Sequence, residues 1–287
     1  MALLDVFARH SDDPFALSAL EFDVLWQHLG LGDQPLVIRV DSPGRTFEER
    51  SWLEEAAWRD LGQRGLGCPG AVHGELRSLL RRLERPDVEV DGRLWLGERR
   101  VRVLAAATRG RGALAVLEHK RVTLRAVEGS GLARAAVGTA PARPAGPGHS
   151  VTLRAEQLDS AAARAGGSAD ALRTALCGGG VREEDARTLA EMVREAGDRG
   201  QFGVARRDSW GSRRRLDRVI AFFDTPKGRY LQTRRGAPDG SSWSVVSPVD
   251  SRRLVQHVED MLSEVRGQAA AGLPSDGHVV GAPWSTP

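Results

Sequence analysis

Apolar residues recur at intervals of three and four positions in three stretches of the first hundred residues, which is the spacing of an amphipathic helix. Ser18 and Glu21 stand at capping-box spacing before the first stretch, and Thr46 and Glu49 stand so before the second. The third stretch stops before Pro86, since proline disfavours a helical residue in front of it. The pattern predicts three helices, at about 20–29, 46–65 and 74–83. It also predicts a short strand at 36–40.

From Val88 the apolar period changes to two, as expected for strands that bury one face. Asp91-Gly92, Gly110 and Gly112 interrupt this pattern where turns are expected. A four-stranded antiparallel meander is therefore predicted, and a short helix follows it. The predicted strands are 88–91, 101–103, 113–117 and 122–124, and the predicted helix is 132–137.

The second half of the chain repeats the same order of elements. Three helices are predicted first, then four strands, then a last helix. The helices are predicted at 155–164, 169–176, 183–195 and 251–265, and the strands at 201–206, 218–224, 229–234 and 243–247.

The repetition extends to residue identity. Arg102-Val103-Leu104-Ala105 is followed by Gly112 ten residues after Arg102, and Arg218-Val219-Ile220-Ala221 is followed by Gly228 ten residues after Arg218. A match of both identity and spacing indicates an internal duplication. Two such α+β units would bury most of their apolar surface by joining their meanders or by packing them about a pseudo-twofold axis.

The organisation along the chain follows from these patterns. Residues 138–149 alternate Pro, Gly and Ala, which predicts a flexible or extended linker. The last residues mix Gly, Ala, Pro and Ser and are predicted to be a disordered tail. The predicted parts are an N-terminal extension 1–17, a first repeat 18–137, the linker 138–149, a second repeat 150–266 and the tail 267–287.

Composition indicates a globular protein. The 287 residues are 41% hydrophobic and 28% charged, and charges interrupt every apolar run before it is long enough to cross a bilayer. The first nine residues include Asp5 and lack the basic and apolar regions of a secretory signal. These features predict a cytoplasmic protein that does not insert into a membrane.

The net charge of +3 raises the question of nucleic acid. Acidic residues nearly match the arginines in number, so most of the charge is expected on a mixed, solvated surface. Arg213-Arg214-Arg215 is the one dense cationic run, which we interpret first as a loop and second as a phosphate site. An arginine-rich nucleic-acid-binding regulator therefore stays as the alternative function, and its binding would fall steeply with salt.

The motifs that could indicate catalysis, a cofactor or a metal do not occur in the structural context that those functions require. Gly65–Gly70 satisfies GxGxxG, but a helix precedes it and Pro69 lacks an amide proton, so it is interpreted as a helix end. Cys68 and Cys177 have no partners at metal-ligand spacing. Asp224-Thr225-Pro226 is interpreted as a hairpin turn in preference to a metal site. The sequence predicts no catalytic residue, no cofactor and no metal, although a Ser/His/Asp triad assembled in space stays open.

Large rings concentrate on the strands of the second half. Phe222 and Phe223 are adjacent on one strand, so one points to each face of the sheet, and Tyr230 and Trp243 lie on neighbouring strands. Such a sheet needs cover on both faces. Either helices cover both faces, or one face is a partner site.

Four stretches stand out by their residue identities: Ser42-Pro43-Gly44, Val88-Glu89-Val90-Asp91, Gly200-Gln201-Phe202-Gly203-Val204 and Asp224-Thr225-Pro226 with Gly228-Arg229-Tyr230. In order and spacing they resemble the EspG family, the secretion-associated proteins of type VII (ESX) systems in actinobacteria. The resemblance runs from about Ala19 to Val265.

The resemblance implies a cytosolic, non-enzymatic chaperone with a quasi-twofold α+β fold, in which helical bundles flank a central antiparallel sheet. It implies a helical client, such as a PE–PPE heterodimer gripped at the apolar tip of the PPE protein or another WXG-type protein, which is kept soluble for export. A homo-oligomer is left open. The family supplies no fixed contact residues, so the predicted partner contacts come from the strands themselves: Phe202, Phe222, Arg229, Tyr230 and Trp243.

Overall fold

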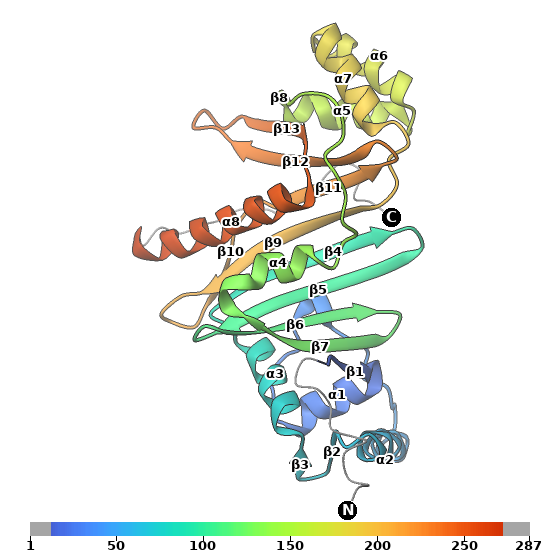
Figure 1. The fold of residues 1–287 in the computed structure, drawn as a ribbon, viewed down its shortest axis with the longest axis vertical. Helices are drawn as coiled ribbons and strands as arrows, with labels where there is room; N and C mark the ends of the chain where they lie inside the picture. Colours follow the sequence, from blue (N-terminus) through green and yellow to red (C-terminus); the bar gives the residue numbers. More distant parts are fainter. Residues whose placement is uncertain (1–12, 272–287) are drawn as a thin grey trace, which may run out of the picture. The chain divides into compact units, whose positions relative to one another are not determined.

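The computed structural model describes residues 13–271, which fold into helices and antiparallel strands (Figure 1). The chain divides into two compact units. The first comprises residues up to 89 together with 102–136, and the second comprises 90–101 and the residues from 137 onward. The predicted extension 1–17 and tail 267–287 lie only partly within the described residues. Residues 15–17 belong to a strand and 267–271 to a helix, so the extension and the tail are shorter than predicted, and residues 1–12 and 272–287 lie outside the described residues.

The first unit places its helices before most of its strands. Its strands lie in the order β1-β7-β6-β5, and the pairs β1–β7 and β6–β7 are antiparallel. Its elements are β1 (Phe15–Ser18), α1 (Ala19–His28), the 3-10 helix η1 (Leu36–Ile38), α2 (Phe47–Gln63), β2 (Gly67–Cys68), β3 (Ala71–Val72), α3 (Gly74–Glu84), β5 (Arg99–Thr108), β6 (Arg111–Glu118), β7 (Arg121–Glu128), the 3-10 helix η2 (Gly129–Gly131) and α4 (Leu132–Val137).

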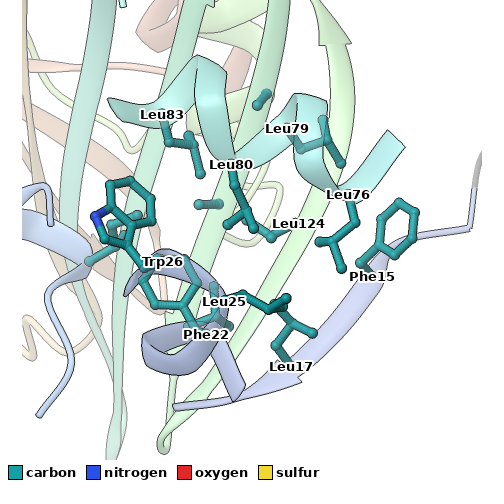
Figure 2. Packing of buried hydrophobic residues seen from close by; sticks show 14 of the residues in the cluster. Phe15, Leu17, Phe22, Leu25, Trp26, Leu76, Leu79, Leu80, Leu83 and Leu124 are labelled. Atoms are coloured by element: carbon teal, nitrogen blue, oxygen red, sulfur yellow. The ribbon is translucent and has the colours of Figure 1, made fainter. Parts of the chain in front are cut away.

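Apolar stripes of two helices form the core of this unit. Figure 2 shows rings from α1 and leucines from α3 directed toward strand side chains such as Leu124. The indole Nε1 of Trp26 donates to the carbonyl oxygen of Gly32 at 2.6 Å, so the one polar atom of this buried ring has an acceptor. The buried helix residues are Phe22, Leu25 and Trp26 in α1 and Leu76, Leu79, Leu80 and Leu83 in α3.

Side-chain caps begin the first two helices, as the sequence predicts. The Ser18 hydroxyl accepts from the Glu21 amide at 3.2 Å, and the Glu21 carboxylate accepts from the Ser18 amide at 2.7 Å. The Thr46 hydroxyl accepts from the Glu49 amide at 3.1 Å. Both caps satisfy amides that a helix leaves without partners.

The predicted strand over 36–40 is wrong, because residues 36–38 form a single 3-10 turn. The buried carboxylate of Asp23 accepts bonds from Gln34 at 3.1 Å and Ser42 at 2.9 Å, on either side of the turn. Arg50 forms an ion pair with the same carboxylate at 2.7 Å. This network holds the segment as a loop, which the apolar run at 36–40 does not reveal.

The second unit has its helices between a first strand and a meander. Its strands lie in the order β4-β9-β11-β12-β13-β8, and β10 pairs with β9. Its elements are β4 (Val88–Leu96), β8 (Val151–Arg154), α5 (Ala155–Ala165), α6 (Ala169–Gly178), α7 (Glu183–Val193), β9 (Arg199–Arg207), β10 (Arg213–Arg215), β11 (Ile220–Thr225), β12 (Gly228–Gly236), β13 (Ser242–Pro248) and α8 (Ser251–Ala271).

The two units share one order of elements. In each, a four-residue strand leads directly into a helix: β1 into α1 and β8 into α5. That strand then pairs antiparallel with the last strand of the meander, β1 with β7 and β8 with β13. The predicted α+β fold and the duplicated order of elements are confirmed.

The Pro/Gly/Ala stretch over residues 138–149 is extended and docked onto β12. The Arg229 amide donates to the Pro144 carbonyl at 2.9 Å, and the Gly146 amide donates to the Arg229 carbonyl at 3.1 Å. The Tyr230 hydroxyl donates to the Pro147 carbonyl at 3.2 Å. In Figure 1 this segment runs across β12 toward β8. Of the two predicted states of the linker, the structure has the extended one.

Candidate partner-binding surface

The structure buries four of the five predicted partner contacts. Phe202, Phe222, Arg229 and Tyr230 are each at most 1% exposed. The expectation that these side chains reach a partner is therefore corrected, since a partner cannot touch them in this conformation. The sequence left open whether both faces of the sheet are covered or one is free for a partner. The burial of these side chains favours a sheet that is covered on both faces.

Stacking between neighbouring strands explains the burial. Phe202 on β9 stacks on Phe222 of β11 at 6.0 Å, and Phe223 of β11 stacks on Tyr230 of β12 at 5.4 Å. Phe223 and Tyr230 also belong to a core cluster with side chains of α5, α6 and α7. Burial raises the pKa of the Tyr230 phenol above its usual value, because the phenolate would lose its hydration.

Two glycines of the Gly200–Val204 stretch give these side chains room. A Cβ on Gly200 would lie 2.4 Å from a Leu94 methyl carbon and 2.7 Å from the Phe222 ring. A Cβ on Gly203 would lie 1.9 Å from the guanidinium of Arg215, which forms a bidentate ion pair with Asp91. Close packing against Leu94 and the Phe222 ring therefore favours glycine at 200, and a side chain at 203 would displace the ion-paired guanidinium of Arg215.

Arg229 has a structural role that the sequence did not reveal. Its Nε and Nη2 donate to the two carboxylate oxygens of Asp224 at 2.7 and 2.8 Å. Nη2 also donates to the Pro141 carbonyl at 2.8 Å, and the guanidinium carbon lies 4.4 Å from the centroid of the Phe222 ring. Asp224 is thus the partner of a buried cation. In the adjoining turn, the Lys227 amide donates to the Thr225 hydroxyl at 3.2 Å.

The run Arg213–Arg215 is a strand, which corrects its interpretation as a loop. Arg213 and Arg215 both form ion pairs with Asp91, and Arg214 forms one with Asp208. These residues pair antiparallel with β9. Three consecutive arginines do not indicate from the sequence which strand they will pair with. Their ion pairs with carboxylates reduce the positive field that a phosphate would meet.

Trp243 is the one predicted contact that stays partly accessible, at 36% exposure. The Arg154 guanidinium carbon lies 5.3 Å from its ring centroid, and its Nε1 donates to the Ser241 hydroxyl at 3.1 Å. That Trp243 contacts a partner stays a prediction. Four more apolar side chains are exposed, none of which the sequence predicts as a partner contact: Leu36, Phe47, Trp52 and Trp210.

A hollow of about 420 Å³ lies in the second unit, between its helices and its strands. This volume is within the usual range of ligand pockets, roughly 300–1,000 Å³. Most of the lining is apolar and small, and Phe223 of β11 contributes the one aromatic ring among the lining residues. They are Ala162, Ala165, Gly167, Ser168, Leu172, Val193, Glu195, Ala196, Gly197, Arg199 and Phe223.

The rim of this hollow is formed by the turn from α7 into β9. Glu195 has a positive φ of 60°, a conformation that costs a residue with a side chain roughly 1–3 kcal/mol. The Gly197 amide donates to the Asp224 carbonyl at 2.9 Å, and the Asp224 amide donates to the Asp198 carbonyl at 2.7 Å. These bonds hold the turn at the rim of the hollow.

A second hollow of about 460 Å³ lies in the first unit, beside the β6–β7 turn. Its lining includes Arg64, Lys120 and Arg121, but also Glu21 and Asp60. Arg64 already forms an ion pair with Glu21 and donates to the carbonyl of residue 16 at 2.7 Å. This hollow offers less apolar lining than the hollow of the second unit, so it is the weaker candidate for an apolar client tip.

Residues 13–271 hold neither a metal-binding cluster nor a membrane-spanning helix. In this part of the chain no group of three or more histidine, cysteine, aspartate or glutamate side chains is arranged to hold a metal ion. Within the same described residues, no helix combines the length and the apolar character needed to cross a bilayer.

Comparison with known proteins places the fold and the sequence in one family. The model of the EspG family matches residues 18–260, and the chain belongs to this family. The fold is similar to that of the Mycobacterium tuberculosis type VII secretion system chaperone EspG5, solved in complex with a PE25–PPE41 dimer. The TM-score is 0.68 at 15% sequence identity, over 87% of this chain and 97% of the EspG5 chain. None of the curated proteins matches the sequence significantly.

Proposed function

We propose that this EspG family member is a type VII secretion chaperone that binds a helical, PE–PPE-like client in the cytoplasm before export. The observation that carries the proposal is the family match over residues 18–260. The shared fold along 97% of the EspG5 chain supports it, because that chaperone was solved with a PE25–PPE41 dimer. We propose further that the protein acts by binding alone.

The physical task of such a chaperone is to cover apolar surface. An exposed apolar tip on a helical client favours aggregation, and contact with a complementary apolar surface removes that tip from water. The hollow between α5, α6, α7 and the strands offers the half-buried side chains of Ala162 and Val193 to such a tip, and the buried Leu172 and Phe223 lie at its lining. We infer that this hollow, in the C-terminal helical bundle, is part of the client site.

The experiment is a pull-down from native cytosol with the tagged full chain at low and high salt, with mass spectrometry of the bound proteins. Co-purification of a small helical PPE-like or WXG-type protein that survives high salt is the expected result. Recovery of nucleic acid alone, released by high salt, would contradict the proposal and favour the regulator. An apolar contact resists salt, whereas phosphate contacts weaken with it.

A further inference from the structure

One cation borders the apolar hollow of the second unit. Ala162, Ala165, Leu172, Val193 and Phe223 give apolar lining, and the guanidinium-bearing side chain in the lining is Arg199. Phe223 stands directly opposite Arg199 in the β9–β11 register. Opposite residues of an antiparallel pair project to the same face of the sheet, so the ring and the guanidinium lie on the face toward the hollow.

Arg199 forms no ion pair with a carboxylate among residues 13–271, whereas Arg50, Arg215 and Arg229 each form one. The recorded neighbour of Arg199 is the Trp95 ring, whose centroid lies 5.6 Å from the guanidinium carbon. Its Nε is buried and meets no acceptor within the described chain. A buried donor without an acceptor costs free energy that an incoming acceptor would recover.

The backbone at Arg199 is held by the neighbouring turn, and the Trp95 ring contacts its guanidinium. Arg199 is the first residue of β9, next to the turn that the Asp224 backbone fixes. The Asp198 carboxylate in this turn accepts from the Gly97 amide at 2.7 Å, which engages one of its oxygens. A cation on an ordered backbone loses less freedom when it binds an anion than one on a disordered backbone.

We propose that the hollow recognises a carboxylate that lies next to an apolar group, with Arg199 as the residue that determines this specificity. We take the occupant to be a segment of the client that carries an acidic side chain beside an apolar one. In this respect the inference rests on the proposed function. A guanidinium presents parallel N–H donors that match a carboxylate. A single cation, with the Glu195 carboxylate in the same lining, suits one negative charge better than a phosphate.

The test uses two probes of the same shape, 4-phenylbutyrate and its neutral analogue 4-phenylbutyramide, titrated into the full-length protein and followed by NMR. The acid is expected to bind about tenfold more tightly than the amide, the ratio for one charge-assisted hydrogen-bonded contact. Arg199→Gln should abolish this preference. Arg199→Lys, which keeps the charge but loses the planar fork, should retain part of it.

Variants of one helix and one control arginine locate the binding. Ala162→Trp fills the hollow and should abolish binding of both probes, whereas Ala163→Trp, at an exposed position of the same helix, should not. Arg252→Gln, at an exposed position of α8, should leave the preference unchanged. Melting temperatures of all variants identify any that do not fold.

Three results overturn the inference: equal binding of acid and amide, an unchanged preference in folded Arg199→Gln, or binding of neither probe. The same experiments distinguish failure of this inference from failure of the proposed chaperone function. A wild-type protein that captures a helical client but shows no acid preference would leave the chaperone proposal standing without the Arg199 specificity. An acid preference without any captured client would leave the site standing without the chaperone.

Discussion

Arg229 is the residue at which β12, the 138–149 segment and α8 are joined. Besides Asp224 and the Pro141 carbonyl, its Nη1 donates to the hydroxyl of Ser251, the first residue of α8, at 3.3 Å. The side chain is fully buried. A buried cation is tolerated only when its charge and its donors are satisfied, and here the partners come from three separate parts of the second unit.

Arg229→Met should lower the free energy of unfolding by roughly 3–5 kcal/mol, because it removes the buried, bidentate cation of Asp224 and leaves that carboxylate only the half-exposed Arg143, at 4.0 Å. Urea unfolding of the purified variant measures the loss. Arg234→Met on the same strand is the matched control, since Arg234 forms an ion pair with the more exposed Asp159 and should lose only about 1 kcal/mol or less. Equal losses in the two variants would contradict the structural role of Arg229.

At the scale of elements, the 138–149 segment shows why composition alone is a weak guide to order. Alternating Pro, Gly and Ala lack large side chains to bury, so the stretch is typical of a linker. Its order comes instead from backbone bonds to β12, which any residue type with a free amide or carbonyl can make. Gly146 is the point of closest approach in this contact.

Gly146→Ala should destabilise the protein by roughly 1–3 kcal/mol, the usual cost of overpacking, because the new Cβ would lie 2.2 Å from Cζ of Tyr230. Thermal unfolding with circular dichroism measures it. Gly74→Ala is the control, since no heavy atom lies within 4 Å of its Cβ position. In the Tyr230→Ala background the same substitution should cost less, and full additivity would contradict the contact.

At the scale of the whole molecule, client capture depends on surface that stays accessible after each unit has filled its own core. The aromatic side chains of β9, β11 and β12 are buried in that core, whereas Ala162 and Val193 at the lining of the second unit's hollow stay partly accessible. Two neighbouring alanines of α5 allow a test of whether the client binds in this hollow. Ala162 lines the hollow, and Ala163 is exposed outside it.

Ala162→Trp should reduce client recovery in the pull-down at least tenfold, because an indole would occupy the space that the apolar tip needs. Ala163→Trp should leave recovery unchanged, and both variants should keep the melting temperature within a few degrees of the parent. Quantitative mass spectrometry of the bound fraction gives the ratio. Undiminished capture by a folded Ala162→Trp protein would place the client site elsewhere.

The candidate site was only partly accessible to prediction from the sequence. The pattern at 218–224 and 229–234 correctly indicated strands with rings on both faces, but it could not show which rings would be covered. Arg199 lies one residue before Gly200 of the resemblance stretch and was not singled out. An arginine gives no signal of being unpaired until its neighbours in space are known.

The sequence by itself determined the helices with capped, periodic apolar faces, the two meanders, their duplication and the family, because these depend on local spacing and residue identity. Only the tertiary structure decided the short strands β1, β8 and β10, the docking of 138–149, the burial of Phe222 and Tyr230 and the lone cation of the hollow. Each of these depends on partners distant in the chain. The period of apolar residues carries no information about which distant segment will supply the contact.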